Sequence, residues 1–276
     1  MGRVFTFEEI RQGWMPATRD FKEMWEILEA ELSASSAIIG SVICGSCVRG
    51  DYNVRSDIDC VVLYRQTDRS EAIDLFQGLE VEAAEIYVPL ELIPLDDKLA
   101  ETSDHHLSPI FLEHLRLSVR LGGVIKENPL ELISPNPMSF REDTILYLID
   151  KIRKLEKGSA RLPVLSTEKL CLFLQKALEL PVYVARKIVQ CKGYDLTGDD
   201  SKGEVLRAYA ETRFTPAIEL LEELVSLDRR YSEALGQQIM EAPDQASYGK
   251  ILRKIEEAVP KVLQFARLNL ADLRTQ

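Results

Sequence analysis

The chain of 276 residues is poor in the side chains that usually bind transition metals. It has only three histidines, all between residues 105 and 114, and they have no partners at the spacing that a zinc site needs. Its five cysteines are odd in number and scattered, so they indicate reduced thiols rather than a disulfide framework. Cys44-x-x-Cys47 has the spacing of a redox pair or half a zinc site, but no second such pair exists.

Long hydrophobic runs are also lacking. No apolar stretch approaches 18 residues, which argues against a transmembrane helix. Residues 1–11 lack the apolar segment of a secretory signal, so we expect a cytoplasmic protein. The hydrophobic content of 46% is ample for a buried core, and the length favours two domains.

Positive charge is scarce in the first half of the chain. Residues 1–138 contain 12 basic and 24 acidic residues, a net charge of −12, whereas residues 139–276 contain 22 and 21, a net charge of +1. Ten of the basic residues lie within 151–192, where they could neutralise phosphate oxygens or form solvated helix faces. The overall acidity argues against extended nucleic acid as a partner.

Residues 45–59 read Gly-Ser-Cys-Val-Arg-Gly-Asp-Tyr-Asn-Val-Arg-Ser-Asp-Ile-Asp and stand between apolar runs at 37–44 and 60–63. This pattern predicts strand, glycine-bearing turn and strand. Asp57 and Asp59 are two residues apart, so in a strand both carboxylates point to one face. Two such anions need a cation, Mg²⁺ prefers oxygen ligands, and a glycine–serine turn suits a phosphate. The segment therefore predicts a site for a magnesium-bound nucleoside triphosphate.

The pattern Gly45-Ser46, Gly50 and Ser56-Asp57-Ile58-Asp59 resembles the signature of nucleotidyltransferases of the DNA polymerase β superfamily. Arg49-Gly50-Asp51 is similar to the small bacterial branch, which includes antibiotic nucleotidyltransferases and MNT antitoxins. The resemblance implies two Mg²⁺ ions, a nucleoside triphosphate donor, expected to be ATP, and nucleotide contacts from Gly45, Ser46, Arg49 and Ser56. The alternative is that both serines are ordinary turn or capping residues and Arg49 a solvated one.

A third carboxylate is expected, because two metal ions about 3.5–4 Å apart need more than two anions. The resemblance places it on a neighbouring strand some tens of residues later. Glu85 precedes the apolar segment 86–90 and is preferred over Glu82; in a regular strand the two lie on opposite faces. Asp57, Asp59 and Glu85 are thus the expected catalytic and metal-binding residues. Glu85 or Asp150 is the candidate general base, although Asp150 could equally be a paired acid.

Strand signals end at the three prolines between residues 127 and 137, which indicate a linker. Beyond them, apolar residues recur at helical spacing and predict five or six antiparallel helices. The expected fold class is α+β. Residues 1–128 would form a nucleotidyltransferase domain, a small mixed sheet flanked by helices, and residues 139–276 an all-α bundle that binds substrate and nucleotide.

The expected activity is Mg²⁺-dependent transfer of a nucleoside monophosphate, expected to be AMP, to a hydroxyl of a small molecule such as an aminoglycoside-like antibiotic. One alternative is an MNT-type antitoxin that modifies a protein hydroxyl. Another is a regulatory module that binds nucleotide without turnover. A HEPN-type ribonuclease is excluded for the bundle, because its motif needs a histidine and residues 139–276 contain none.

Overall fold

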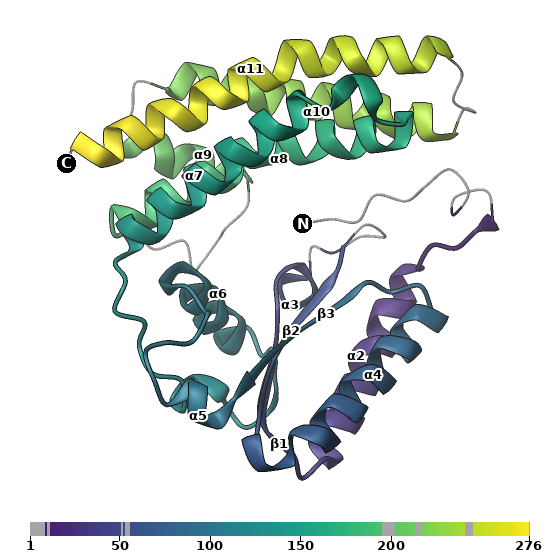
Figure 1. The fold of residues 1–276 in the computed structure, drawn as a ribbon, viewed down its shortest axis with the longest axis vertical. Coiled ribbons are helices and arrows are strands. Elements are labelled where there is room, and N and C mark those ends of the chain that lie inside the picture. The colour runs from purple at the N-terminus through teal and green to yellow at the C-terminus, as the bar shows by residue number, and fades with distance from the viewer. Residues whose placement is uncertain are drawn as a thin grey trace. The chain divides into compact units, whose positions relative to one another are not determined.

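The computed structural model describes residues 9, 12–50, 52, 56–194, 202–212, 217–240 and 245–275. The chain divides into two compact units, Met1–Met138 and Ser139–Gln276 (Figure 1). Their hydrophobic cores are separate, because the buried clusters of the first unit share no residue with that of the second. Each unit is described by itself.

The first unit combines four strands with helices of very different lengths. Its longer elements are α2 (Thr18–Ala34), β1 (Ile38–Cys44), β2 (Ile58–Tyr64), α4 (Arg69–Glu85), β3 (Leu90–Asp96) and α6 (Pro109–Arg120). Its shorter elements are α3 (Ser46–Arg49), the 3₁₀ turn η1 (Gln66–Asp68), α5 (Asp97–Ala100), β4 (Val124–Lys126) and the 3₁₀ turn η2 (Pro129–Glu131).

The four strands form one mixed sheet in the order β3-β2-β1-β4. β1 is antiparallel to β2 and β4, whereas β2 and β3 are parallel and are connected through α4. A parallel pair needs such a crossover, since a tight hairpin can join only antiparallel strands. The small mixed sheet flanked by helices is the predicted architecture, and the fold class is confirmed.

Side chains on β2 alternate between two cores, as the pleat of a strand requires. Ile58, Cys60 and Val62 are fully buried and belong to the core that α2 and α4 form on one face of the sheet (Figure 1). Val61 and Leu63, equally buried, belong to the core on the opposite face, to which α5 and α6 contribute. Burial on both faces explains why the strand reads as a continuous apolar run.

The prediction that Glu85 lies on a strand is wrong, because residues 79–85 form the last turns of α4. The alternation Leu-Glu-Val-Glu in this segment imitates a strand. The residues that α4 buries, Ala72, Phe76, Leu79 and Ala83, are instead three or four apart, which is the spacing of a helix. The parallel strand β3 starts only at Leu90.

The segment that the prolines indicated as a linker packs on the first unit. Ile133 is buried in the core that contains α5 and α6, and the Ser134 amide donates to the Ala100 carbonyl over 2.8 Å. The unit boundary falls between Met138 and Ser139. Ser139 begins the next helix with a capping box, in which the Ser139 amide donates to Glu142 Oε2 over 2.9 Å.

The second unit is helical, as predicted. Its elements are α7 (Phe140–Ser159), the 3₁₀ turn η3 (Leu162–Val164), α8 (Thr167–Cys191), α9 (Lys202–Glu211), α10 (Ile218–Met240) and α11 (Gln245–Thr275). α8 buries residues along its whole length and contributes to one core with the other four helices. Within the described ranges, no helix is both long enough and apolar enough to cross a membrane.

Candidate active site

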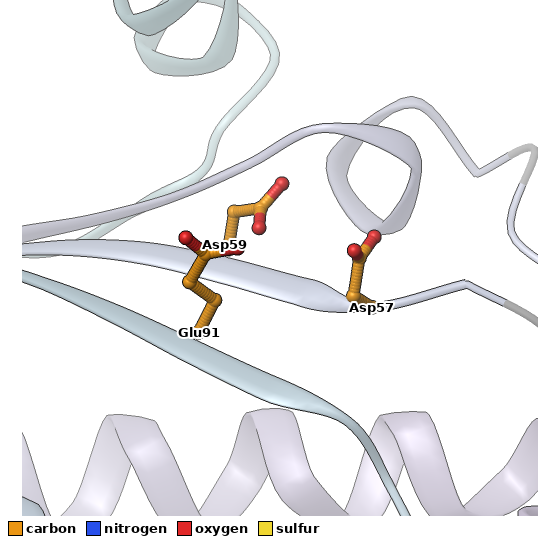
Figure 2. Close-up of side chains that lie close together, drawn as sticks. All are labelled: Asp57, Asp59 and Glu91. Atoms are coloured by element: carbon orange, nitrogen blue, oxygen red, sulfur yellow. The ribbon is translucent and has the colours of Figure 1, made fainter. Parts of the chain in front are cut away.

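Asp57 and Asp59 lie at the start of β2 and flank its first residue, Ile58. The Ile58 side chain is fully buried on the face that α2 and α4 cover. Because alternate residues of a strand point to opposite faces, both aspartates point away from those helices, as Figure 2 shows. The buried isoleucine therefore fixes the direction of both carboxylates.

Glu91 brings a third carboxylate to this point from the neighbouring strand. It is the second residue of β3 and stands opposite Asp59 in the parallel register. Carboxylate oxygens of Asp57, Asp59 and Glu91 lie within 4.8 Å of one another, and in Figure 2 the Glu91 side chain points to the same side of the sheet as the aspartates. Asp57 and Asp59 are half-buried, whereas Glu91 is exposed.

The electrostatics of this triad favour a positive ligand. Burial raises the pKa of Asp59 to about 7, and the negative charges of Asp57 and Glu91 add to the rise. A carboxylate that is both desolvated and close to like charges is destabilised until a cation neutralises it. Three oxygen donors of this kind are the ligands that Mg²⁺ prefers. The residues present therefore fit a divalent metal ion.

A tight turn at the end of β1 borders the triad. Gly45 has φ 83° and ψ −149°, a backbone conformation that is essentially restricted to glycine. A Cβ built on it would lie 3.4 Å from Asp59 Oδ2, so the backbone approaches the carboxylate closely. The short helix α3 follows and ends at Gly50 in the left-handed conformation. Ser46 and Arg49 are half-buried in α3, and Ser56, just before Asp57, is buried.

Residues 22–116 match the family of the nucleotidyltransferase domain. The chain carries a nucleotidyltransferase domain. The match runs from within α2 to within α6 and includes the glycine turn and all three carboxylates. It is consistent with the polymerase β superfamily that the sequence signature indicated, and the family consists of transferases that move nucleotidyl groups. A comparison with curated proteins finds no match.

The structure brings together some of the residues predicted for the nucleotidyltransferase site and separates others. Asp57 and Asp59 are adjacent as expected. Glu85 and its runner-up Glu82 lie on the last turns of α4, where both are exposed and neither belongs to the carboxylate triad. The carboxylate that the structure places beside Asp57 and Asp59 is therefore Glu91, whereas Glu85 lies on a helix and not on the expected strand.

Glu91 carries a sequence signal that we did not use. It stands between Leu90 and Leu92, in the alternation typical of a half-buried strand. Pro89 and Pro94 hide this signal, because proline is normally excluded from sheet interiors. β3 lies at the edge of the sheet, where a proline such as Pro94 can be accommodated without loss of a ladder hydrogen bond.

Asp150, the other candidate general base, lies on α7 in the second unit. Its Oδ2 atom is 2.8 Å from Lys154 Nζ, one helical turn further on, and the side chains of Asp150 and Lys154 are 49% and 67% exposed. This geometry fits a paired surface acid, which was the alternative interpretation of Asp150.

The cysteines beside the triad are free thiols, Cys44 buried and Cys47 half-buried. Cys44 lies in the core that contains α5 and α6, whereas Cys47 packs against the core of α2 and α4. Burial raises the pKa of Cys47 to about 12, and the charges of Asp57 and Asp59 raise it further; burial also raises the pKa of Cys44 strongly. All five cysteines of the chain are free.

Proposed function

We propose that the protein transfers a nucleoside monophosphate from a nucleoside triphosphate, with ATP as the expected donor, to a hydroxyl of a small acceptor. The single observation that carries this proposal is the carboxylate triad of Asp57, Asp59 and Glu91 on two adjacent strands of a nucleotidyltransferase domain. A regulatory module without turnover would not need all three carboxylates at one point.

In this proposal the triad holds two Mg²⁺ ions. When bound, the ions would neutralise the charge of the triphosphate and activate the acceptor oxygen. Asp59 suits this role because burial and the neighbouring carboxylates raise its pKa to about 7, so a bound cation would stabilise its charged form. Asp57 and Glu91 complete a set of oxygen donors contributed by β2 and β3.

The turn after β1 would bind the β- and γ-phosphates. Gly45 allows the backbone to approach the triad, and Ser46 adds a hydroxyl. Arg49 would neutralise phosphate oxygens, and Ser56 would contact the nucleotide beside Asp57. These roles follow from the position of the turn next to Asp59 and from the family signature.

The reaction would be an in-line displacement at the α-phosphorus. The acceptor oxygen forms the new P–O bond, the bond to the β-phosphate oxygen breaks, and pyrophosphate leaves. The acceptor proton would pass to Glu91, the most exposed carboxylate of the triad. The net charge of −12 in residues 1–138 suits a cationic acceptor, such as an amino sugar of the aminoglycoside type.

Calorimetric titration with ATP, GTP, CTP and UTP, with and without Mg²⁺, tests the donor site. We expect Mg²⁺-dependent binding of one or more nucleotides by the wild type and none by the double variant Asp57→Ala/Asp59→Ala. Glu85→Ala is the matched control, because it removes an exposed acid outside the triad. Equal titrations for wild type and double variant would refute the proposal.

The acceptor class is tested by following the label of α-³²P-ATP in the presence of Mg²⁺. Label transferred to kanamycin or streptomycin would support a small hydroxyl acceptor. Label that appears only on protein would instead support a protein-modifying enzyme and refute this part of the proposal.

A further inference from the structure

The connection between α6 and β4 contains two adjacent glycines that serve different purposes. Gly122 has φ 87°, in the left-handed region that favours glycine, and its amide closes the end of α6 by donating to the Val119 carbonyl over 3.1 Å. The Gly123 amide donates to the Ser118 carbonyl over 2.9 Å, and the Gly123 carbonyl accepts from the Ile43 amide over 2.8 Å. Gly123 therefore joins the end of α6 to the last part of β1.

Gly123 leaves no room for a side chain. A Cβ atom built on it would lie 2.4 Å from the Ile43 carbonyl oxygen, 3.0 Å from Val48 Cγ2 and 3.1 Å from the Ser118 carbonyl oxygen. Two of these three atoms belong to the backbone, which cannot rotate aside as the end of a long side chain can. A glycine is needed where backbones approach this closely, so a larger residue would push the α6–β4 connection away from β1 and α3.

Two of these contacts connect Gly123 to the turn after β1. Ile43 lies two residues before Gly45, and Val48 is the third residue of α3, which follows Gly45 directly. Val48 is half-buried and packs against the core of α2 and α4. Val48 therefore ties α3 both to that core and to the α6–β4 connection.

The carboxylate triad lies outside this set of contacts. Asp57 immediately precedes β2, Asp59 lies on β2, and Glu91 lies on β3. The three atoms nearest to the Cβ position of Gly123 belong to β1, α3 and α6, and none belongs to β2 or β3. A change at Gly123 therefore acts on the turn before it acts on the carboxylates.

We propose that Gly123 is a positioning residue that fixes the turn after β1 relative to the triad; this inference rests on the proposed function. Gly123 touches no substrate in this role and acts through Val48 and the end of β1. Ser46 and Arg49 belong to α3, so a displaced α3 carries both side chains away from phosphates whose metal ions stay at the triad.

Calorimetric titration of Gly123→Ala with Mg²⁺-ATP and with Mg²⁺-tripolyphosphate tests this role. Both affinities should fall about tenfold, or about 1.4 kcal/mol, because both ligands carry the phosphates that the turn would bind. The number of binding sites per chain should stay as in the wild type. This number separates the two explanations, because partial misfolding lowers the number of sites, whereas a displaced turn lowers the affinity of every site.

Gly40→Ala is the matched control. Gly40 lies in β1, four residues before Cys44, and a Cβ atom on it would lie 2.7 Å from the Glu127 carbonyl oxygen and 3.3 Å from the Pro129 nitrogen. The substitution thus forces a similar backbone clash into the same sheet, but none of the three nearest atoms belongs to α3. We expect a lower melting temperature, as for Gly123→Ala, and unchanged affinity for both ligands.

Val48→Ala tests the same contact without a clash. It removes the Cγ2 methyl group that lies nearest to the Cβ position of Gly123 and should weaken binding of both ligands about threefold, or about 0.7 kcal/mol. Val48→Ala decides the question if Gly123→Ala does not fold.

The inference is overturned if folded Gly123→Ala, or Val48→Ala in its place, binds Mg²⁺-tripolyphosphate as tightly as the wild type. An equal loss of affinity in Gly40→Ala would also overturn it. In both cases the proposed function stands, provided that Asp57→Ala/Asp59→Ala abolishes the binding shown by the wild type. A wild type that titrates like this double variant would refute the proposed function together with the inference.

Discussion

The two faces of β2 differ in what their side chains do for the protein. On one face Ile58, Cys60 and Val62 are fully buried against the core of α2 and α4. On the other, Val61 and Leu63 are buried in the same way, but Asp57 and Asp59 occupy the end of the strand. β2 and the residue just before it therefore contribute to both cores of the domain and supply two of the three carboxylates of the candidate site.

This difference shows how the apolar residues of the fold hold together carboxylates whose mutual repulsion and burial destabilise it. The apolar residues fix the register of β2 against β1 and β3, and that register places Asp59 opposite Glu91. Burial and like charges then raise the pKa of Asp59 to about 7, so its charged form is destabilised in the folded protein. Substitution of the carboxylates should lower activity, whereas substitution of the buried Ile58 should lower the free energy of unfolding.

The largest expected effect is the loss of activity when a carboxylate of the triad is substituted. Asp59→Ala should lower the rate of nucleotidyl transfer at least about 1,000-fold, or about 4 kcal/mol in the barrier, because it removes a proposed ligand of the metal ions. Glu91→Ala should lower it by a similar factor, whereas Glu85→Ala should stay within about twofold of the wild type. Pyrophosphate release under saturating Mg²⁺ measures all three, and comparable losses for Glu85→Ala and Glu91→Ala would contradict the corrected assignment.

The next largest effect is on the free energy of unfolding, from substitutions on the face of β2 that α2 and α4 cover. Ile58→Ala should lower the free energy of unfolding by about 3 kcal/mol, since it leaves a cavity in a fully buried position between the two aspartates. Ile58→Val should lower it by about 1 kcal/mol. Urea denaturation without metal measures both; a loss for Ile58→Ala below that for Ile58→Val would show that the site is not packed as described.

In metal-free protein, Asp59→Asn should raise the free energy of unfolding, whereas the Ile58 substitutions lower it. Between the unfolded-state pKa of about 4 and the folded-state pKa of about 7, the folded protein holds a proton that the unfolded chain has lost. Asp59 therefore makes the wild type less stable as the pH rises through this window. Three pKa units correspond to about 4 kcal/mol, and solvent screening of the half-buried carboxylate reduces this to roughly half. Asp59→Asn should therefore remove the pH dependence and raise the free energy of unfolding at pH 8 by roughly 2 kcal/mol, measured by urea denaturation in EDTA.

A parallel pH dependence of wild type and Asp59→Asn would contradict the raised pKa. Glu85→Gln serves as the control, because Glu85 is exposed and should not change the slope of stability against pH.

The smallest expected effect concerns the turn. Gly45→Ala should lower the free energy of unfolding by roughly 1–2 kcal/mol, because alanine is strained at φ 83° and ψ −149°. Gly78→Ala is a control of opposite sign: Gly78 lies within α4 with no atom within 4 Å of an added Cβ, so alanine should stabilise the helix by up to about 1 kcal/mol. Thermal unfolding in EDTA compares the two, and equal shifts would contradict the turn geometry.

The aspartates could be predicted from sequence because they follow directly from local pattern. Asp57, Ile58 and Asp59 alternate next to an apolar run, and the glycine turn precedes them within the same segment. The third carboxylate could not be predicted this way. Glu91 joins the site through a non-local parallel pairing whose register depends on where α4 ends, and the sequence of α4 imitates a strand at Leu79–Glu82.

We infer that Asp57, Asp59 and Glu91 together hold the metal ions of a nucleotide site. The most direct test counts bound Mn²⁺ by electron paramagnetic resonance, with Mn²⁺ in place of Mg²⁺ and a non-hydrolysable ATP analogue present. We predict two ions per chain for the wild type and for Glu85→Ala, fewer than two for Glu91→Ala, and none for Asp57→Ala/Asp59→Ala. Two ions bound to every variant, or none to the wild type, would contradict the account.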